Sequence, residues 1–195
     1  MTGTFVGEDK SKIVLFDILS SELIKSTFSE NCEVIIVSTW VKDYPIPTTW
    51  PSFSSNYIEI KDMQKISDVL RKLLDNGISI TILTKSEKTL RSEGWGDVNT
   101  TQAIEFHQKL KESGAAVCYT AKNHGKYVIT SENVFISSAN ETNTGMGGEQ
   151  GNAGTLHSRS KNEDLYNESL KWCLDWIKKS ENPDEYFMKN HYFSK

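Results

Sequence analysis

The chain has 195 residues, which is the size of a single domain. Hydrophobic residues make up 37% and charged residues 25%, a composition typical of a folded globular protein and unlike that of a disordered, collagen-like or coiled-coil chain. The formal net charge of −4 argues against a polybasic nucleic-acid binder, although it allows local basic sites. The longest apolar runs fall far short of the ~18 residues that span a bilayer, and no basic segment leads into an apolar stretch at the N-terminus. We therefore expect neither a signal peptide nor work at a membrane.

The three cysteines, Cys32, Cys118 and Cys173, are odd in number and far apart. No two of them have the spacing of metal ligands, and an odd count argues against a disulfide framework. We expect reduced, mostly buried thiols in a cytoplasmic protein, with a catalytic thiol as the alternative.

Composition along the chain divides it into three parts. Residues 1–12 are polar and contain glycine, so we expect a flexible N-terminal segment. The periodic apolar pattern that follows predicts one domain at 13–180, with a C-terminal tail at 181–195.

Strand and helix patterns alternate through the first half of the chain. They predict, in order, a helix at 20–28, a strand at 33–38, an irregular proline-rich loop at 40–60, a helix at 62–75, a strand at 78–83, a loop at 85–99 and a helix that begins at 99 or 100 and is closed by Gly114. The 33–38 run is continuously apolar and β-branched, which is typical of a strand buried on both faces.

The second half begins with more strands and closes with a helix. It predicts a strand at 115–119, a hairpin of strands at 126–130 and 134–138, a segment rich in Gly, Asn, Thr and Ser at 142–161, and a last helix at 162–179. This order predicts an α/β fold with a mixed, mainly parallel sheet flanked by helices, an α/β/α sandwich. No Gly-rich phosphate loop follows the first strand.

One short segment places chemically active side chains on the hairpin. His124 and Lys126 are two residues apart, so in a strand they project side by side, with Gly125 on the opposite face where backbones can approach closely. Ser138 and Asn140 repeat this geometry on the neighbouring strand. An imidazole can attack or protonate a phosphate, and the other three groups can hold its oxygens.

A second His-x-Lys, at His107 and Lys109, falls in a predicted helix with no strand pair after it. We interpret His107 as a surface or half-buried histidine of a helix, without a catalytic role.

Segment 123–145 resembles the signature of the phospholipase D superfamily, the HKD phosphodiesterases. That signature is His-x-Lys, four residues, Asp, a short spacer and Gly-Ser-x-Asn. His124 and Lys126 match the motif histidine and lysine, and Ser138 and Asn140 match Ser and Asn of the second part. Ser131 stands where the family has aspartate, and the spacer is one residue shorter.

The resemblance implies a fold, a mechanism and a partner. It implies the phospholipase D-like sandwich and a phosphohistidine formed on His124, with a second histidine protonating the leaving oxygen and no metal or cofactor. Small members with one motif supply the second histidine by homodimerising across a two-fold axis, so the resemblance implies a dimer of this chain. In small members a later glutamate orients the histidine. Glu149 is the candidate that we favour, and Asn152 is the alternative.

Other basic residues are candidate phosphate contacts. His157 and Arg159 are expected on the side of the motif, where they would assist substrate binding. Lys85, Lys88 and Arg91 follow a strand end and are either phosphate contacts or part of a solvated loop.

Two loop tryptophans, Trp50 and Trp95, are either base-stacking residues or caps on the edge of the core.

The sequence favours a metal-independent phosphodiesterase, a nuclease acting on DNA or RNA. The first alternative is an HKD domain that has lost catalysis and acts as a nucleic-acid-binding or assembly module, which the absent aspartate favours. The second alternative is a phospholipid phosphodiesterase.

Overall fold

The computed structural model describes residues 2–6, 10–29, 31–47, 63–140, 142, 146 and 153–189, with side chains from residue 10 to residue 186. The strands are β1 (Thr2–Val6), β2 (Glu33–Val37), β3 (Ser79–Thr84), β4 (Ala116–Tyr119), β5 (Tyr127–Thr130), β6 (Asn133–Ser137) and β7 (Ala153–Ser158). The helices are α1 (Lys10–Ser26), α2 (Ile66–Asp75), α3 (Glu87–Ser92), α4 (Asp97–Glu112), α6 (Glu163–Lys178) and α7 (Asp184–Lys189).

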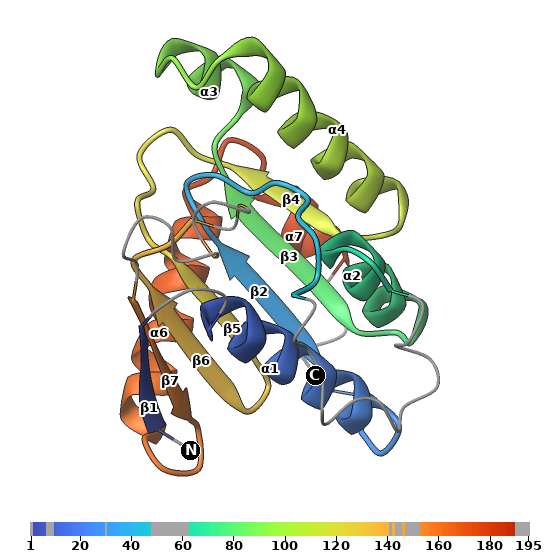
Figure 1. Ribbon diagram of the computed structural model, residues 1–195, viewed down its shortest axis with the longest axis vertical. Coiled ribbons are helices and arrows are strands. Elements are labelled where there is room, and N and C mark those ends of the chain that lie inside the picture. Colours follow the sequence, from blue (N-terminus) through green and yellow to red (C-terminus); the bar gives the residue numbers. More distant parts are fainter. Residues whose placement is uncertain are drawn as a thin grey trace.

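The described strands form one mixed sheet in the order β1-β7-β6-β5-β2-β3-β4 (Figure 1). Strands β2, β3 and β4 pair in parallel, while β5 runs antiparallel to β2 and continues into the antiparallel ribbon β5-β6-β7-β1. The expected mixed sheet is confirmed. The sheet was expected to be mainly parallel, but two of the described strand pairings are parallel and four are antiparallel.

Helices cover both faces of the sheet, as expected for an α/β/α sandwich (Figure 1). On β2, Val34 and Ile36 join the core cluster beneath α1, α2 and α4, whereas Ile35 and Val37 join the cluster beneath α6. A strand buried on both faces must be apolar at every position, which explains the unbroken run in the sequence.

Helix α2 shows how sequence patterns set its limits. Its buried residues Ile66, Val69, Leu70 and Leu73 follow the helical repeat, and Gly77, with φ of 78°, lies just past its end. The predicted end of this helix is therefore confirmed.

Three differences from the sequence expectations lie near the ends of the chain. The first residues form β1, which pairs with β7, and α1 begins at Lys10 instead of residue 20. In its first turn helix α1 buries the polar residues Ser11 and Lys12, which obscure the apolar repeat that would have marked the start of the helix. In the expected tail, α7 packs beside β4.

None of the helices among the described residues is long and apolar enough to cross a bilayer.

Candidate active site

Polar residues gather at the edge of the sheet where the parallel strands β2 and β3 end. Ser38 directly follows β2 and Lys85 directly follows β3. Because β5 is antiparallel to β2, its beginning lies at this same edge, and Tyr127 pairs with Val37. His124 and Lys126 immediately precede β5 and therefore also lie here. The carboxyl ends of parallel strands are the usual place for a binding site in α/β proteins.

The segment from His124 to Lys126 alternates faces as the sequence predicted. A Cβ atom on Gly125 would lie 2.2 Å from the ring of Trp172 on α6, so that face of the segment meets α6 directly. Val128 points into the opposite core cluster. Residues 124 and 126 therefore face away from α6, on one side of the segment, and the His124 side chain is exposed to solvent.

Asn123 ties this segment to two strand ends. Its carbonyl accepts a hydrogen bond from the Thr39 hydroxyl (3.3 Å), and the Thr39 carbonyl accepts one from Thr84 (3.3 Å). Its side-chain Oδ1 accepts the backbone N–H of Gly125 at 2.7 Å. Asn123 is fully buried, and its Nδ2 has no hydrogen-bond partner among the described residues. These contacts hold the backbone of the motif rigidly.

Lys126 occupies a half-buried position next to a second lysine. Its ammonium donates to the His124 carbonyl at 3.0 Å. Burial, and then the positive charge of Lys85, lower the pKa of Lys126. Lys85 itself is 1% exposed and bonds both carboxylate oxygens of Glu93, at 2.5 and 2.6 Å. The solvated-loop alternative is therefore wrong for Lys85.

Asn140 lies at the same edge of the sheet, where its side chain contacts the residue that follows β2. The Ser38 hydroxyl approaches Asn140 Oδ1 at 3.4 Å and donates to the Trp40 carbonyl at 2.9 Å. Because Oδ1 of Asn140 faces Ser38, the NH₂ group of the same side chain points away from the Ser38 hydroxyl. Ser138 lies nearby, but its hydroxyl accepts the Ala153 N–H at 3.0 Å. A phosphate bound to Ser138 would compete with this contact between β6 and β7.

Two of the predicted substrate-binding residues lie elsewhere, which corrects the expectation. His157 pairs with Val134 on β6, and the Arg159 backbone donates to the Glu132 carbonyl at 2.8 Å. Strand β7 runs antiparallel to β6, so these residues lie at the opposite edge of the sheet from Lys126.

Three further candidates, Glu149, Asn152 and Trp50, lie outside the described residues.

Ser131 occupies the turn between β5 and β6, as expected, at the edge of the sheet opposite His124. Its hydroxyl accepts a hydrogen bond from Lys25 at 2.9 Å, and its backbone N–H donates to Glu22 at 3.3 Å. Ser131, at the position of the family aspartate, therefore contacts α1.

The three cysteines are free and buried, as expected. Burial raises the pKa of Cys118 to about 11, and burial followed by the nearby Glu22 raises that of Cys32 to about 11. Thiols held protonated in this way are poor nucleophiles, so the catalytic-thiol alternative loses support.

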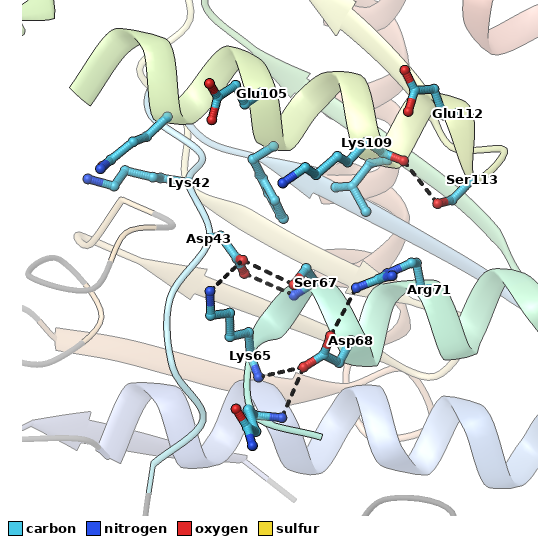
Figure 2. Close-up of a pocket in the computed structure, with 14 residues that line it drawn as sticks. Lys42, Asp43, Lys65, Ser67, Asp68, Arg71, Glu105, Lys109, Glu112 and Ser113 are labelled. Carbon is cyan, nitrogen blue, oxygen red and sulfur yellow. Dashed lines mark hydrogen bonds and ion pairs between the residues drawn. The ribbon is translucent and has the colours of Figure 1, made fainter. Parts of the chain in front are cut away.

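A separate cleft of about 840 Å³ lies between α2 and α4 (Figure 2). Its acidic side chains are largely engaged: Asp43 accepts from the Ser67 hydroxyl at 3.1 Å, and Asp68 pairs with Arg71 at 3.0 Å. Lys109 points into it from α4. The residues that line this cleft do not include His124, Lys126 or Asn140.

Comparison with known proteins agrees with the fold. Residues 52–172 match a family model described as "Cardiolipin synthase, PLD-like domain". No curated protein matches the chain.

Solved structures share the fold at low identity. Nuc from Salmonella typhimurium, described as a phospholipase D family member, is 13% identical with a TM-score of 0.56, over 93% of this chain and 97% of that one. NucT from Helicobacter pylori is 14% identical with a TM-score of 0.58, over 92% and 97%. TrmBL2, an archaeal chromatin protein, is 13% identical with a TM-score of 0.51, over 92% of this chain and 53% of that one. With more than half of its length matched by the family model, and with this fold, the chain belongs to the phospholipase D superfamily.

Proposed function

We propose that the chain is a metal-independent phosphodiesterase, a nuclease that hydrolyses DNA or RNA through a phosphohistidine in a homodimer. One observation carries the proposal: an exposed imidazole, a half-buried ammonium and an oriented amide, from His124, Lys126 and Asn140, gather at the carboxyl edge of the sheet. We place the protein in the cytoplasm because its three thiols are free.

The chemistry follows from these three groups. A ring nitrogen of His124 attacks phosphorus, a P–N bond forms, and the P–O bond to the leaving strand breaks. Lys126 and the NH₂ group of Asn140 stabilise the negative charge on the non-bridging oxygens. Water then attacks phosphorus, the P–N bond breaks, and His124 leaves as the free imidazole.

A second histidine completes the proton balance. It donates a proton to the leaving oxygen in the first step and removes one from water in the second. The sequence has one such motif, and His124 is exposed where a second copy of the chain can reach it. We therefore place the His124 of a second copy in this role. If light scattering shows a monomer at micromolar concentration, and that monomer is fully active, the dimer is contradicted.

Nucleic acid is the substrate that the relatives support best. Nuc and NucT cover nearly the whole chain, and TrmBL2 is described as showing a novel mode of DNA binding. We propose Glu149, or else Asn152, as the residue that orients His124.

Each of the alternatives has one observation in its favour. Ser131, in place of the motif aspartate, favours a binding module without catalysis. The description of the family model, which names cardiolipin synthase, favours a phospholipid substrate.

One assay separates these three functions. The protein is incubated in excess EDTA with DNA, RNA, bis(p-nitrophenyl) phosphate and vesicles that contain phosphatidylglycerol, and products are measured with each. Cleavage of DNA or RNA is expected. Turnover of the vesicles alone would favour the lipid enzyme, and binding of nucleic acid without any turnover would favour the binding module.

A further inference from the structure

Two tryptophans stand beside the motif at the carboxyl edge of the sheet. The rings of Trp40 and Trp95 stack with centroids 5.3 Å apart and planes inclined by 16°. Trp40 follows β2 by three residues, and its carbonyl shares the Ser38 hydroxyl with Asn140. The stacked pair is therefore linked to a motif side chain through a single hydroxyl group.

The loop that carries Trp95 is anchored on several sides. Glu93 holds the buried ammonium of Lys85, Asp97 pairs with Arg91, and the Trp95 carbonyl accepts from Asn99 at 3.2 Å. These contacts anchor the backbone around Trp95, and stacking on Trp40 orients its ring before any ligand arrives, so little side-chain freedom is lost on binding.

The stacked pair is partly open to solvent. Trp40 and Trp95 are both half-buried, and Val98, in the first turn of α4, is 71% exposed. An aromatic and aliphatic surface of this kind, next to a phosphate-binding motif, suits a planar apolar ligand attached to a phosphate.

The charges around the pair favour an anionic strand. The acids of this loop and of the adjoining ends of α3 and α4 are paired: Glu87 and Asp97 with Arg91, and Glu93 with Lys85. Lys42 instead bonds a neutral amide, Asn99 Oδ1, at 2.9 Å. Its positive charge is thus not neutralised by that contact and can attract a phosphate.

We propose that Trp95, backed by Trp40, is a stacking platform for an unpaired base next to the phosphate that is cleaved. This inference rests on the proposed function, and it assigns the single-stranded form of the nucleic acid to the site. A base inside a duplex has both faces covered by its neighbours, so an unpaired base is the form that stacks on Trp95.

Fluorescence anisotropy with two strands of equal charge tests the platform. All proteins carry His124→Ala so that the strands stay intact, and excess EDTA is present. The probes are labelled oligothymidylate and an abasic strand of the same length. We expect oligothymidylate to bind about tenfold more tightly than the abasic strand, and Trp95→Ala to remove this difference.

Control variants and strands separate stacking from general effects. Trp95→Phe keeps an aromatic ring and should retain most of the preference for bases. Phe28→Ala removes an aromatic side chain that is 86% exposed on the segment after α1, and should change neither affinity. A long duplex, in which very few base faces are open, should bind without any dependence on Trp95.

Several results would overturn the platform. These are equal binding of the two strands by the parent protein, an equal loss for both strands in Trp95→Ala, or a Trp95-dependent affinity for the duplex. Base-dependent binding here, together with no cleavage of DNA or RNA by the chain that retains His124, would support the platform and contradict the nuclease. If the protein binds neither strand, both the platform and the proposed nuclease function are contradicted.

Discussion

The two His-x-Lys segments of this chain share a pattern and differ in almost everything else. His107 lies in helix α4, is 1% exposed, and its Nε2 lies 3.0 Å from the Val41 carbonyl. Lys109, two residues on, points from the other side of the helix into the cleft between α2 and α4 (Figure 2). His124 and Lys126 lie in an extended segment, on one side of it.

The difference follows from backbone geometry. Residues two apart are about 200° apart around a helix but point the same way in an extended chain. Burial also changes the chemistry of the His107 ring, because desolvation lowers the pKa of His107 to about 4. His107 was expected to be a surface or half-buried residue without a catalytic role. The structure buries it at 1% exposure, so it lies deeper than expected and is a structural residue of the core.

The largest expected effect concerns His124. His124→Ala should lower phosphodiester turnover by at least about a thousandfold, because the attacking group is lost. The melting temperature should stay the same, because the side chain is exposed. Turnover is measured with bis(p-nitrophenyl) phosphate and unfolding by calorimetry. Retention of a tenth or more of the activity would contradict the assignment of the nucleophile.

The second effect concerns the glycine between the two motif side chains. Gly125→Ala should lower activity about a hundredfold, because a Cβ atom would meet the Trp172 ring at 2.2 Å and displace the segment. Trp172 packs on Tyr127 with centroids 4.9 Å apart, so its ring cannot move aside cheaply. Gly125→Ala combined with Trp172→Leu should regain part of the activity. If the double variant is no better than Gly125→Ala alone, close packing on α6 does not position the motif.

The third effect concerns His107 and falls on stability. His107→Ala should reduce the free energy of unfolding by about 2 kcal/mol at pH 7, because it opens a cavity and removes the contact with the Val41 carbonyl. Activity per folded molecule should be unchanged. An activity loss that matches that of His124→Ala would contradict the contrast between the two segments.

The same substitution should also change the pH dependence of stability. The folded pKa of His107, about 4, lies below the unfolded value of roughly 6.5, so the unfolded chain binds the proton first. Parent stability should therefore fall as pH drops from about 6.5 to about 4, by roughly 3 kcal/mol from this group. The variant should lack this loss. Glu33, whose pKa burial raises to about 7, acts in the opposite direction in both proteins and cancels in the comparison.

The smallest effect concerns the position of the missing aspartate. Ser131→Asp should change stability by less than about 1–2 kcal/mol and activity less than twofold, because Ser131 lies at the opposite edge of the sheet. Lys25 would compensate the new charge, while Glu22 and Glu132 would repel it. A tenfold rise in activity would instead show that the departure from the motif limits catalysis.

Strands that are buried on both faces of the sheet were predictable from their apolar sequences. The strands at 33–38, 78–83, 126–130 and 134–138 were found within one or two residues of their predicted limits. The prediction that His124 and Lys126 project side by side rested on strand geometry, and in the structure both residues precede β5.

Contacts between distant segments were not predictable. Nothing in the sequence near Asn123 indicates that Thr39 will bond its carbonyl, and nothing near Lys85 indicates that its buried ammonium will pair with Glu93. The reversed direction of β7, which carries His157 and Arg159 to the other edge, depends on its pairing with β6. One signal does exist for Ser38 and Thr39, because they follow a strand predicted to be buried and parallel.

Covalent trapping tests the central claim most directly. The protein is mixed with an end-labelled single strand in EDTA, the reaction is stopped within the first turnover at alkaline pH, and the modified peptide is identified by mass spectrometry. We expect a nucleotide linked through phosphorus to His124, which is retained in His107→Ala and absent in His124→Ala. Cleavage at the parent rate with no adduct, or an adduct on any other residue, would contradict the account.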